Sequence, residues 1–170
     1  MQPGRGRQHG EELPPLGIAQ RQAHGPNGQR EIPAADFFVD YLTSALELDE
    51  ILTAIRIPKL GPGWGYHYEK FHRTAQSWAT VGVAALVRRD NGTIAEARIG
   101  LTNMGTVPVR ATAAEQAAAG VQASRAALSE AATHADEGTE PPSDLHGAPD
   151  YRRHLARVLT GRALAAAAGV

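Results

Sequence analysis

The fold is decided by residues 65–103, which read GYHYEKFHRTAQSWATVGVAALVRRDNGTIAEARIGLTN. Two runs rich in apolar residues, 79–87 and 94–101, flank the tripeptide Asp90-Asn91-Gly92. Asn-Gly between such runs predicts an antiparallel hairpin, because both residues tolerate the positive φ that a type I′ turn requires. Residues 66–71 alternate in the same way and are expected to form a third strand, since a lone hairpin is only marginally stable in water.

Helices are predicted on the C-terminal side of this sheet. Thr112 followed by Glu115 fits a capping box at the start of a short alanine-rich helix that ends near residue 119. A second helix is expected over residues 121–134, and Pro149 fits the first turn of a last one. The last helix presents one apolar stripe, formed by Tyr151, Leu155, Val158 and Leu159. The predicted class is therefore α+β, a small three-stranded antiparallel sheet covered on one face by about three helices.

Three segments are distinguished along the chain. Residues 1–30 are rich in Gly, Pro, Gln, Arg and His without strand or helix periodicity, and they are predicted to be a disordered or atypical N-terminus. This composition also fits a truncated or frame-shifted start. Residues 31–60 contain a short helical turn at 33–38 and a strand at 49–57 that Pro58 ends. Residues 61–170 hold the predicted sheet and helices.

Composition excludes several classes of function. The chain has 170 residues, a formal net charge of −1 and no cysteine, so disulfides, thiolate nucleophiles and iron–sulfur ligation are ruled out within it. The weak charge disfavours a nucleic-acid partner. No apolar run approaches the roughly 20 residues of a membrane span, and the N-terminus lacks the apolar core of a signal peptide. A cytoplasmic protein without a membrane span is expected.

No catalytic or metal-ligating residue can be assigned from spacing. His67 and His72 are five residues apart on or beside a predicted strand and are expected to face opposite sides, and the other histidines lie on separate elements. No serine lies in a nucleophile elbow of the G-x-S-x-G type. Neither a metal site nor a Ser-His-Asp arrangement is therefore predicted.

Aromatic residues are concentrated in one short stretch. Five of the nine in the chain fall within fifteen positions, namely Trp64, Tyr66, Tyr68, Phe71 and Trp78. One interpretation is that alternate aromatics pack on the helices while Lys70 and Arg73 lie at the solvated rim. The other is that a flat aromatic ligand stacks on one of them with a cation at its edge. Single-stranded nucleic acid would use the same chemistry but fits the weak charge less well.

Four ordered motifs carry a resemblance to a known family. They are Tyr68-Glu69-Lys70-Phe71…Arg73…Ser77-Trp78-Ala79-Thr80, Gly100-Leu101-Thr102-Asn103-Met104-Gly105…Pro108-Val109-Arg110-Ala111, Phe37-Phe38…Thr43…Leu46…Asp49-Glu50-Ile51-Leu52…Ile55-Arg56-Ile57-Pro58, and Asp144-Leu145-His146-Gly147…Tyr151-Arg152-Arg153. Over residues 31–168 the chain resembles the medium, FAD-binding subunit of molybdenum hydroxylases, of the carbon monoxide dehydrogenase type. The match covers the C-terminal domain of that subunit, residues 61–170, and the end of its FAD-binding domain, residues 31–60.

The resemblance implies a cofactor site and partner subunits. It puts Trp78 where an aromatic side chain stacks on the isoalloxazine ring of FAD, Lys70 near the polar edge of that ring, and Leu52 in the segment that touches the cofactor. The family often has aspartate at position 77, and Ser77 removes that carboxylate. The implied partners are a large subunit with the molybdenum cofactor and a small subunit with iron–sulfur clusters, which pass electrons through the flavin to an acceptor.

The glycine-rich loops that hold the FAD pyrophosphate in this family are missing from residues 1–30. Without them most contacts to the phosphates and the adenine are lost, so this chain alone is expected to bind FAD weakly or not at all and to be inactive alone. It then corresponds to the distal part of a flavoprotein subunit. The alternative is a non-catalytic remnant or interaction module that folds without FAD.

Overall fold

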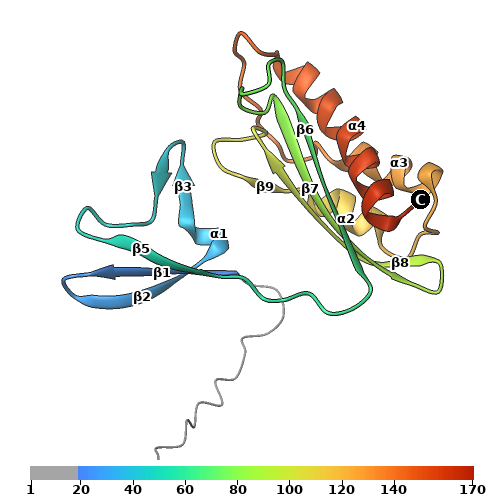
Figure 1. Cartoon of the computed structure of the whole chain (residues 1–170). Coiled ribbons are helices and arrows are strands. Elements are labelled where there is room, and N and C mark those ends of the chain that lie inside the picture. The colour runs from blue at the N-terminus through green and yellow to red at the C-terminus, as the bar shows by residue number, and fades with distance from the viewer. Residues whose placement is uncertain (1–18) are drawn as a thin grey trace, which may run out of the picture. The chain divides into compact units, whose positions relative to one another are not determined.

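The computed structural model of the chain describes residues 19–170 (Figure 1). They form two compact units: the described residues up to Phe37 together with Ser44–Lys59 make the first, and Phe38–Thr43 together with Leu60–Val170 make the second. The second unit resumes at Leu60, one residue before the expected domain start at residue 61. Across residues 19–170, no helix has both the length and the apolar character needed to cross a membrane.

The second unit is built on an antiparallel sheet of four strands in the order β6-β7-β8-β9. Its strands are β6 (Trp64–Phe71), β7 (Val81–Asp90), β8 (Thr93–Thr102) and β9 (Val109–Arg110). The predicted hairpin is confirmed, with Asn91 at φ 47° and Gly92 at φ 82° as a type I′ turn requires. The third predicted strand is β6, and the two-residue β9 is an addition to the expected sheet.

Helices cover one face of this sheet (Figure 1). They are α2 (Thr112–Ala118), α3 (Arg125–Ala131), the short 3₁₀ helix η1 (Ala132–His134) and α4 (Pro149–Ala168). The long helix α4 begins with Pro149 as predicted and packs on β6 and β7. Leu155, Leu159 and Leu164 of α4 join the core with alternate residues of β7 and β8. The predicted α+β class is confirmed.

Two predictions about the helix starts are wrong. The cap of α2 is Ala111, with no side-chain hydrogen bond, because Glu115 instead accepts the backbone N–H of Ile99 at 2.7 Å and pairs with Arg110. The second helix begins at Arg125 rather than at residue 121. The short strand β9 leaves the start of β8 without a partner, and the backbone groups of residues 120–123 form hydrogen bonds to the β7–β8 hairpin there. Ser124 then caps α3.

The first unit has a three-stranded antiparallel sheet in the order β2-β1-β5. Its elements are β1 (Gln20–Gly25), β2 (Gly28–Pro33), the helical turn α1 (Ala34–Phe37) and β5 (Ile51–Arg56), while β3 (Phe38–Asp40) and β4 (Thr43–Ser44) pair with each other. The predicted helical turn and strand are thus confirmed. The buried core of this unit is small, with Ala23, Ile32 and Phe37 fully inside.

The prediction of a disordered N-terminus is wrong for residues 20–30, which belong to the β1–β2 hairpin, and residues 1–18 lie outside the described part of the chain. The hairpin turns at Pro26-Asn27, followed by Gly28 at φ 106°. Its strands show no apolar alternation because only Ala23 and Ile32 are buried, so the sequence there is polar on both faces. Strand β1 pairs with β2 on one side and with β5 on the other.

Strand alternation gives the sheet of the second unit two different faces. Val81, Val83 and Val87 of β7 face the helices and are buried. Tyr66, Tyr68 and Lys70 of β6 face the other way and are exposed. In register, Lys70 lies opposite Gly82, and Gly82 lies opposite Thr102. The uncovered face therefore carries the aromatic and basic residues that the sequence singles out.

Candidate functional site: a cavity beside Trp78

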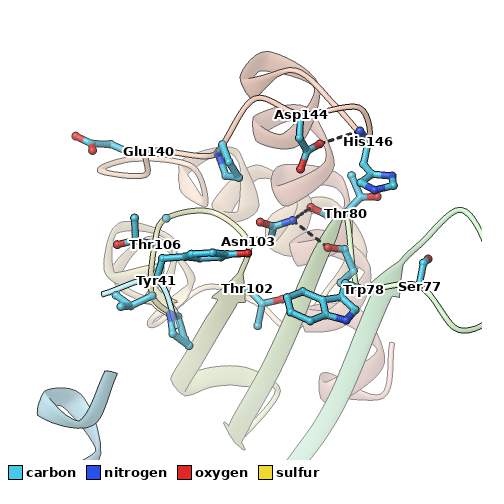
Figure 2. A pocket seen from close by; sticks show the side chains of 15 residues that line it. Tyr41, Ser77, Trp78, Thr80, Thr102, Asn103, Thr106, Glu140, Asp144 and His146 are labelled. Carbon is cyan, nitrogen blue, oxygen red and sulfur yellow. Dashed lines mark hydrogen bonds between the residues drawn. The ribbon is translucent and has the colours of Figure 1, made fainter. Parts of the chain in front are cut away.

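A cavity of about 810 Å³ opens in the second unit, where three loops that are distant in sequence meet (Figure 2). The loop before β7 contributes Ser77 to Thr80, and the loop before α4 contributes Glu140, Pro142, Asp144 and His146. The end of β8 and the loop after it contribute Thr102, Asn103 and residues 105–108. Tyr41, from the segment Phe38–Thr43 that groups with this unit, also lines it. The volume falls in the range of small-molecule and cofactor sites.

The first wall is the loop that carries Trp78. Ser77 closes a turn below it by donating its hydroxyl to the carbonyl oxygen of Thr74 at 2.9 Å, so Ser77 is held by backbone and is not free for other chemistry. Trp78 follows with 78% of its surface exposed. The chain then returns to the sheet at Thr80, whose N–H donates to the carbonyl oxygen of Phe71 at 2.8 Å. The indole is thereby fixed at its base and open to a ligand.

Asn103 joins the second wall to the first. Its side-chain amide donates to the carbonyl oxygens of Ala79 at 3.0 Å and Thr80 at 3.3 Å (Figure 2). The backbone of Asn103 has a φ of 61°, a left-handed conformation that asparagine tolerates better than other side chains outside glycine. The residue therefore both turns the chain at the end of β8 and holds the Trp78 loop.

Arg152 joins the third wall to the first from below. This residue of α4 is completely buried, and its guanidinium donates to the carbonyl oxygen of Thr80 at 2.5 Å, to that of Gly147 at 3.3 Å and to Asp144 Oδ1 at 2.5 Å. A buried guanidinium is costly unless its donors are satisfied. Here the first turn of α4 is bonded to both loops, so Arg152 fixes the distance between two cavity walls.

Asp144 orders the third loop. Its carboxylate accepts the backbone N–H of His146 at 2.8 Å (Figure 2). It also accepts the backbone N–H of Gly147 at 3.2 Å. The hydrogen bond from His146 lowers the pKa of Asp144 below its ordinary value, helped by Arg152 and opposed by partial burial. Asp144 is thus an ionised structural group that keeps His146 at the cavity edge.

The lining chemistry fits a flat heteroaromatic ring better than a phosphate. An exposed indole, apolar Val107 and Pro108, and a few hydroxyl and amide groups offer stacking and edge hydrogen bonds. Among the described lining residues there are two carboxylates, Glu140 and Asp144, and no lysine or arginine. A pyrophosphate would meet the wrong charge here, so the lining favours an uncharged flat ring over a phosphate.

The three residues singled out by the resemblance lie in different places. Trp78 lines the cavity. Lys70 is exposed on the uncovered sheet face, two strands across from the lining residue Thr102, and does not line the cavity itself. Leu52 is on β5 of the first unit, with 38% of its surface exposed.

The interpretation that alternate aromatics pack on the helices is confirmed for Phe71 and wrong for the exposed residues. Tyr66, Tyr68 and Trp78 are exposed, and only Phe71 makes the expected contact, an edge-to-face pair with Tyr151 of α4 at 6.3 Å between ring centroids. Trp64 instead lies under the guanidinium of Arg98, 4.9 Å from its ring centroid. The exposed rings are therefore available to stack on a ligand.

Asn103 and Arg152 are the site residues that the sequence analysis did not identify. Arg152 carries a usable signal, because it lies one turn before Leu155 on the apolar face of α4, where a cation must find buried acceptors. Asn103 gives a weaker one, as a residue that tolerates positive φ directly after a strand.

A family model described as the CO dehydrogenase flavoprotein C-terminal domain matches residues 66–167. The carbon monoxide dehydrogenase medium chain of Hydrogenophaga pseudoflava is 36% identical over 162 residues, which cover 93% of this chain and 56% of that protein. A putative xanthine dehydrogenase FAD-binding subunit of Escherichia coli is 30% identical over 158 residues, 89% of this chain and 54% of that subunit. The chain therefore spans about half the length of the curated relatives it matches.

Solved structures give the same result. Carbon monoxide dehydrogenase from Hydrogenophaga pseudoflava, in a form that lacks the Mo-pyranopterin moiety of the molybdenum cofactor, matches with a TM-score of 0.82 and 39% identity over 88% of this chain and 52% of that one. Quinoline 2-oxidoreductase from Pseudomonas putida 86 matches with a TM-score of 0.83 and 30% identity over 89% of this chain and 53% of that one. Sequence and fold thus point to the same relatives.

Proposed function

Because the chain belongs to the family of the CO dehydrogenase flavoprotein C-terminal domain, we propose that it forms the C-terminal part of the FAD-binding medium subunit of a molybdenum hydroxylase. The observation that carries this proposal is the cavity beside Trp78, which offers an exposed aromatic wall to a flat ring and whose described lining lies within the matched residues 66–167 apart from Tyr41. When bound, FAD supplies the electron-transfer chemistry.

The residues of this chain hold and orient the isoalloxazine ring. Trp78 stacks on one face of it, and the loops held by Arg152 and Asn103 keep that indole in place. Lys70 lies near the polar edge, where an ammonium favours negative charge on the ring. Leu52 of the first unit, which we take as the end of the FAD-binding domain, adds an apolar contact. The pyrophosphate would be held elsewhere in the complete flavoprotein, since the described residues of the cavity lining include no lysine or arginine.

The chain works as one component of a cytoplasmic complex and is inactive alone. In such a complex a large subunit would hold the molybdenum cofactor and a small subunit the iron–sulfur clusters, and this chain would help to hold the flavin, which would supply electron transfer to an acceptor. This division agrees with the absence of cysteine from the chain, which leaves iron–sulfur ligation to a partner.

The first test is the visible absorption spectrum of the purified chain, alone and co-expressed with candidate molybdenum and iron–sulfur subunits. A flavin spectrum in the co-expressed preparation supports the proposal, and its presence in the chain alone would show that no other chain is needed to hold FAD. Absence of flavin from both preparations would contradict the proposal and favour the non-catalytic module.

The role of Trp78 is tested by Trp78→Ala in the preparation that retains flavin. Loss of one aromatic stack of about 0.5–1.5 kcal/mol should weaken FAD retention about 2- to 10-fold and increase the fluorescence of bound flavin. Tyr66→Ala is the matched control, because Tyr66 is equally exposed but does not line the cavity. Unchanged retention and fluorescence in Trp78→Ala would exclude stacking.

A further inference from the structure

A second cavity, of about 380 Å³, lies along the seam between α3 and α4 and shares no lining residue with the one beside Trp78. We refer to it as the arginine groove. Its polar lining comes from both helices and consists of Arg125, Ser129 and Thr133 of α3 and η1 and of Arg157 and Arg162 of α4.

Small residues form the floor of the arginine groove. Gly161 of α4 is buried, and a Cβ placed there would lie 3.5 Å from both Cα and Oγ of Ser129, an ordinary van der Waals contact. Ala165 continues the floor one turn later. Val158 is the other apolar residue of the lining, and the three arginines line the same cavity.

The electrostatic balance of the arginine groove is positive. Among the described residues, its lining contains three guanidinium groups and no carboxylate. Arg157 has one distant partner, with its Nε 3.7 Å from Asp136 Oδ1. Within residues 19–170, Arg125 and Arg162 make neither an ion pair nor a side-chain hydrogen bond, in contrast to Arg153 on the same helix, which pairs with Asp150 at 3.1 Å. Two cations are therefore available to a ligand.

We propose that the arginine groove binds a compact oxyanion, either free phosphate or the phosphate group of a small metabolite. Guanidinium groups donate paired N–H bonds that match the oxygen spacing of a phosphate, and they remain charged at all physiological pH values. The hydroxyl of Ser129 on the same lining is an additional donor of the kind that phosphate sites use, whereas the Thr133 hydroxyl already donates to the carbonyl oxygen of Glu130 at 2.6 Å. The site is independent of the flavin proposal, because the two cavities have no residue in common.

The test is isothermal titration of the purified full chain with inorganic phosphate, pyrophosphate and ADP at constant ionic strength, with chloride as the reference ion. Phosphate or pyrophosphate should bind with millimolar or tighter affinity and raise the melting temperature in a concentration-dependent way. Tighter binding of ADP than of both inorganic ions would identify a nucleotide as the source of the phosphate. Affinity should fall with ionic strength because the arginines are exposed.

Arg125→Gln and Arg162→Gln should each weaken phosphate binding about 10-fold, the loss of one charge-assisted hydrogen-bonding group. Both side chains are exposed, so the variants should keep the circular dichroism spectrum and the melting temperature of the wild type in chloride. Arg153→Gln is the matched control and should bind as the wild type does. Equal binding by all three variants, an equal loss in Arg153→Gln, or no preference for phosphate over chloride would overturn the proposal.

Discussion

Replacement of the buried Arg152 by methionine should destabilise the second unit by about 2–4 kcal/mol at neutral pH. The side chain of methionine has a similar reach and is apolar, so the change removes three hydrogen bonds and leaves little empty space. Charge-assisted bonds contribute about 1.5–3 kcal/mol each, but the guanidinium also loses its hydration on burial, which offsets part of the sum.

The acceptors that Arg152 leaves behind keep other partners, which limits the expected loss. Thr80 retains the Asn103 amide at 3.3 Å, and Asp144 retains the backbone N–H groups of His146 and Gly147. No acceptor is therefore left wholly unpaired in the interior. For this reason the loss of unfolding free energy should stay below the upper end of the roughly 3–5 kcal/mol that is usual for breaking a buried ion pair.

The assay is urea unfolding followed by tryptophan fluorescence. Both tryptophans of the chain, Trp64 and Trp78, lie in the second unit, so the signal reports that unit alone. Arg153→Met is the control: its ion pair with Asp150 is exposed and should contribute less than about 1 kcal/mol. An Arg152→Met variant within about 0.5 kcal/mol of the wild type would refute the view that this residue holds the cavity walls together.

Two further changes test the packing and the charges of the separate units. Gly65→Ala should destabilise the second unit by about 2–3 kcal/mol in the same fluorescence assay, because the new Cβ would lie 1.9 Å from the backbone oxygen of Ala167. Gly100→Ala is the control and should change the stability little, because the space around Gly100 is open. In the first unit, the side-chain hydrogen bonds from Arg30 lower the pKa of Glu50 to about 2, below its unfolded value of 4.5. The stabilisation from the Arg30–Glu50 pair is therefore present above pH 4.5 and is lost as the pH falls towards 2. The difference in unfolding free energy between wild type and Glu50→Gln, measured by circular dichroism, should shrink over that pH range. A difference that does not change with pH would contradict the assignment.

Much of the second unit follows from local sequence. Asn91-Gly92 fixes a turn through its own backbone preferences, and the apolar residues of 79–87 and 94–101 then choose which face is buried. Pro149 similarly marks the start of α4, because the fixed φ of proline suits the first turn of a helix. These signals operate over a few residues, which is why the sheet and the last helix could be predicted without any knowledge of the rest.

Helix starts and polar strands were harder to predict because their partners are distant. Glu115 has the spacing of a capping residue, yet it serves the backbone of Ile99 on β8. Residues 20–30 look irregular because their strands bury only Ala23 before the turn, and their stability depends on β5 further along the chain. In both cases a tertiary contact overrides the local pattern.

The sequence by itself determined the class of fold and the family and singled out Trp78 as a candidate, because each depends on the order of residues along the chain. Only the tertiary structure decided that the indole faces a cavity built from three separate loops, and that Asn103 and the buried Arg152 hold those loops together. The physical reason is that a loop has no periodicity of its own. Its position is set by hydrogen bonds to residues up to 72 positions away, which become neighbours only when the sheet and α4 have packed.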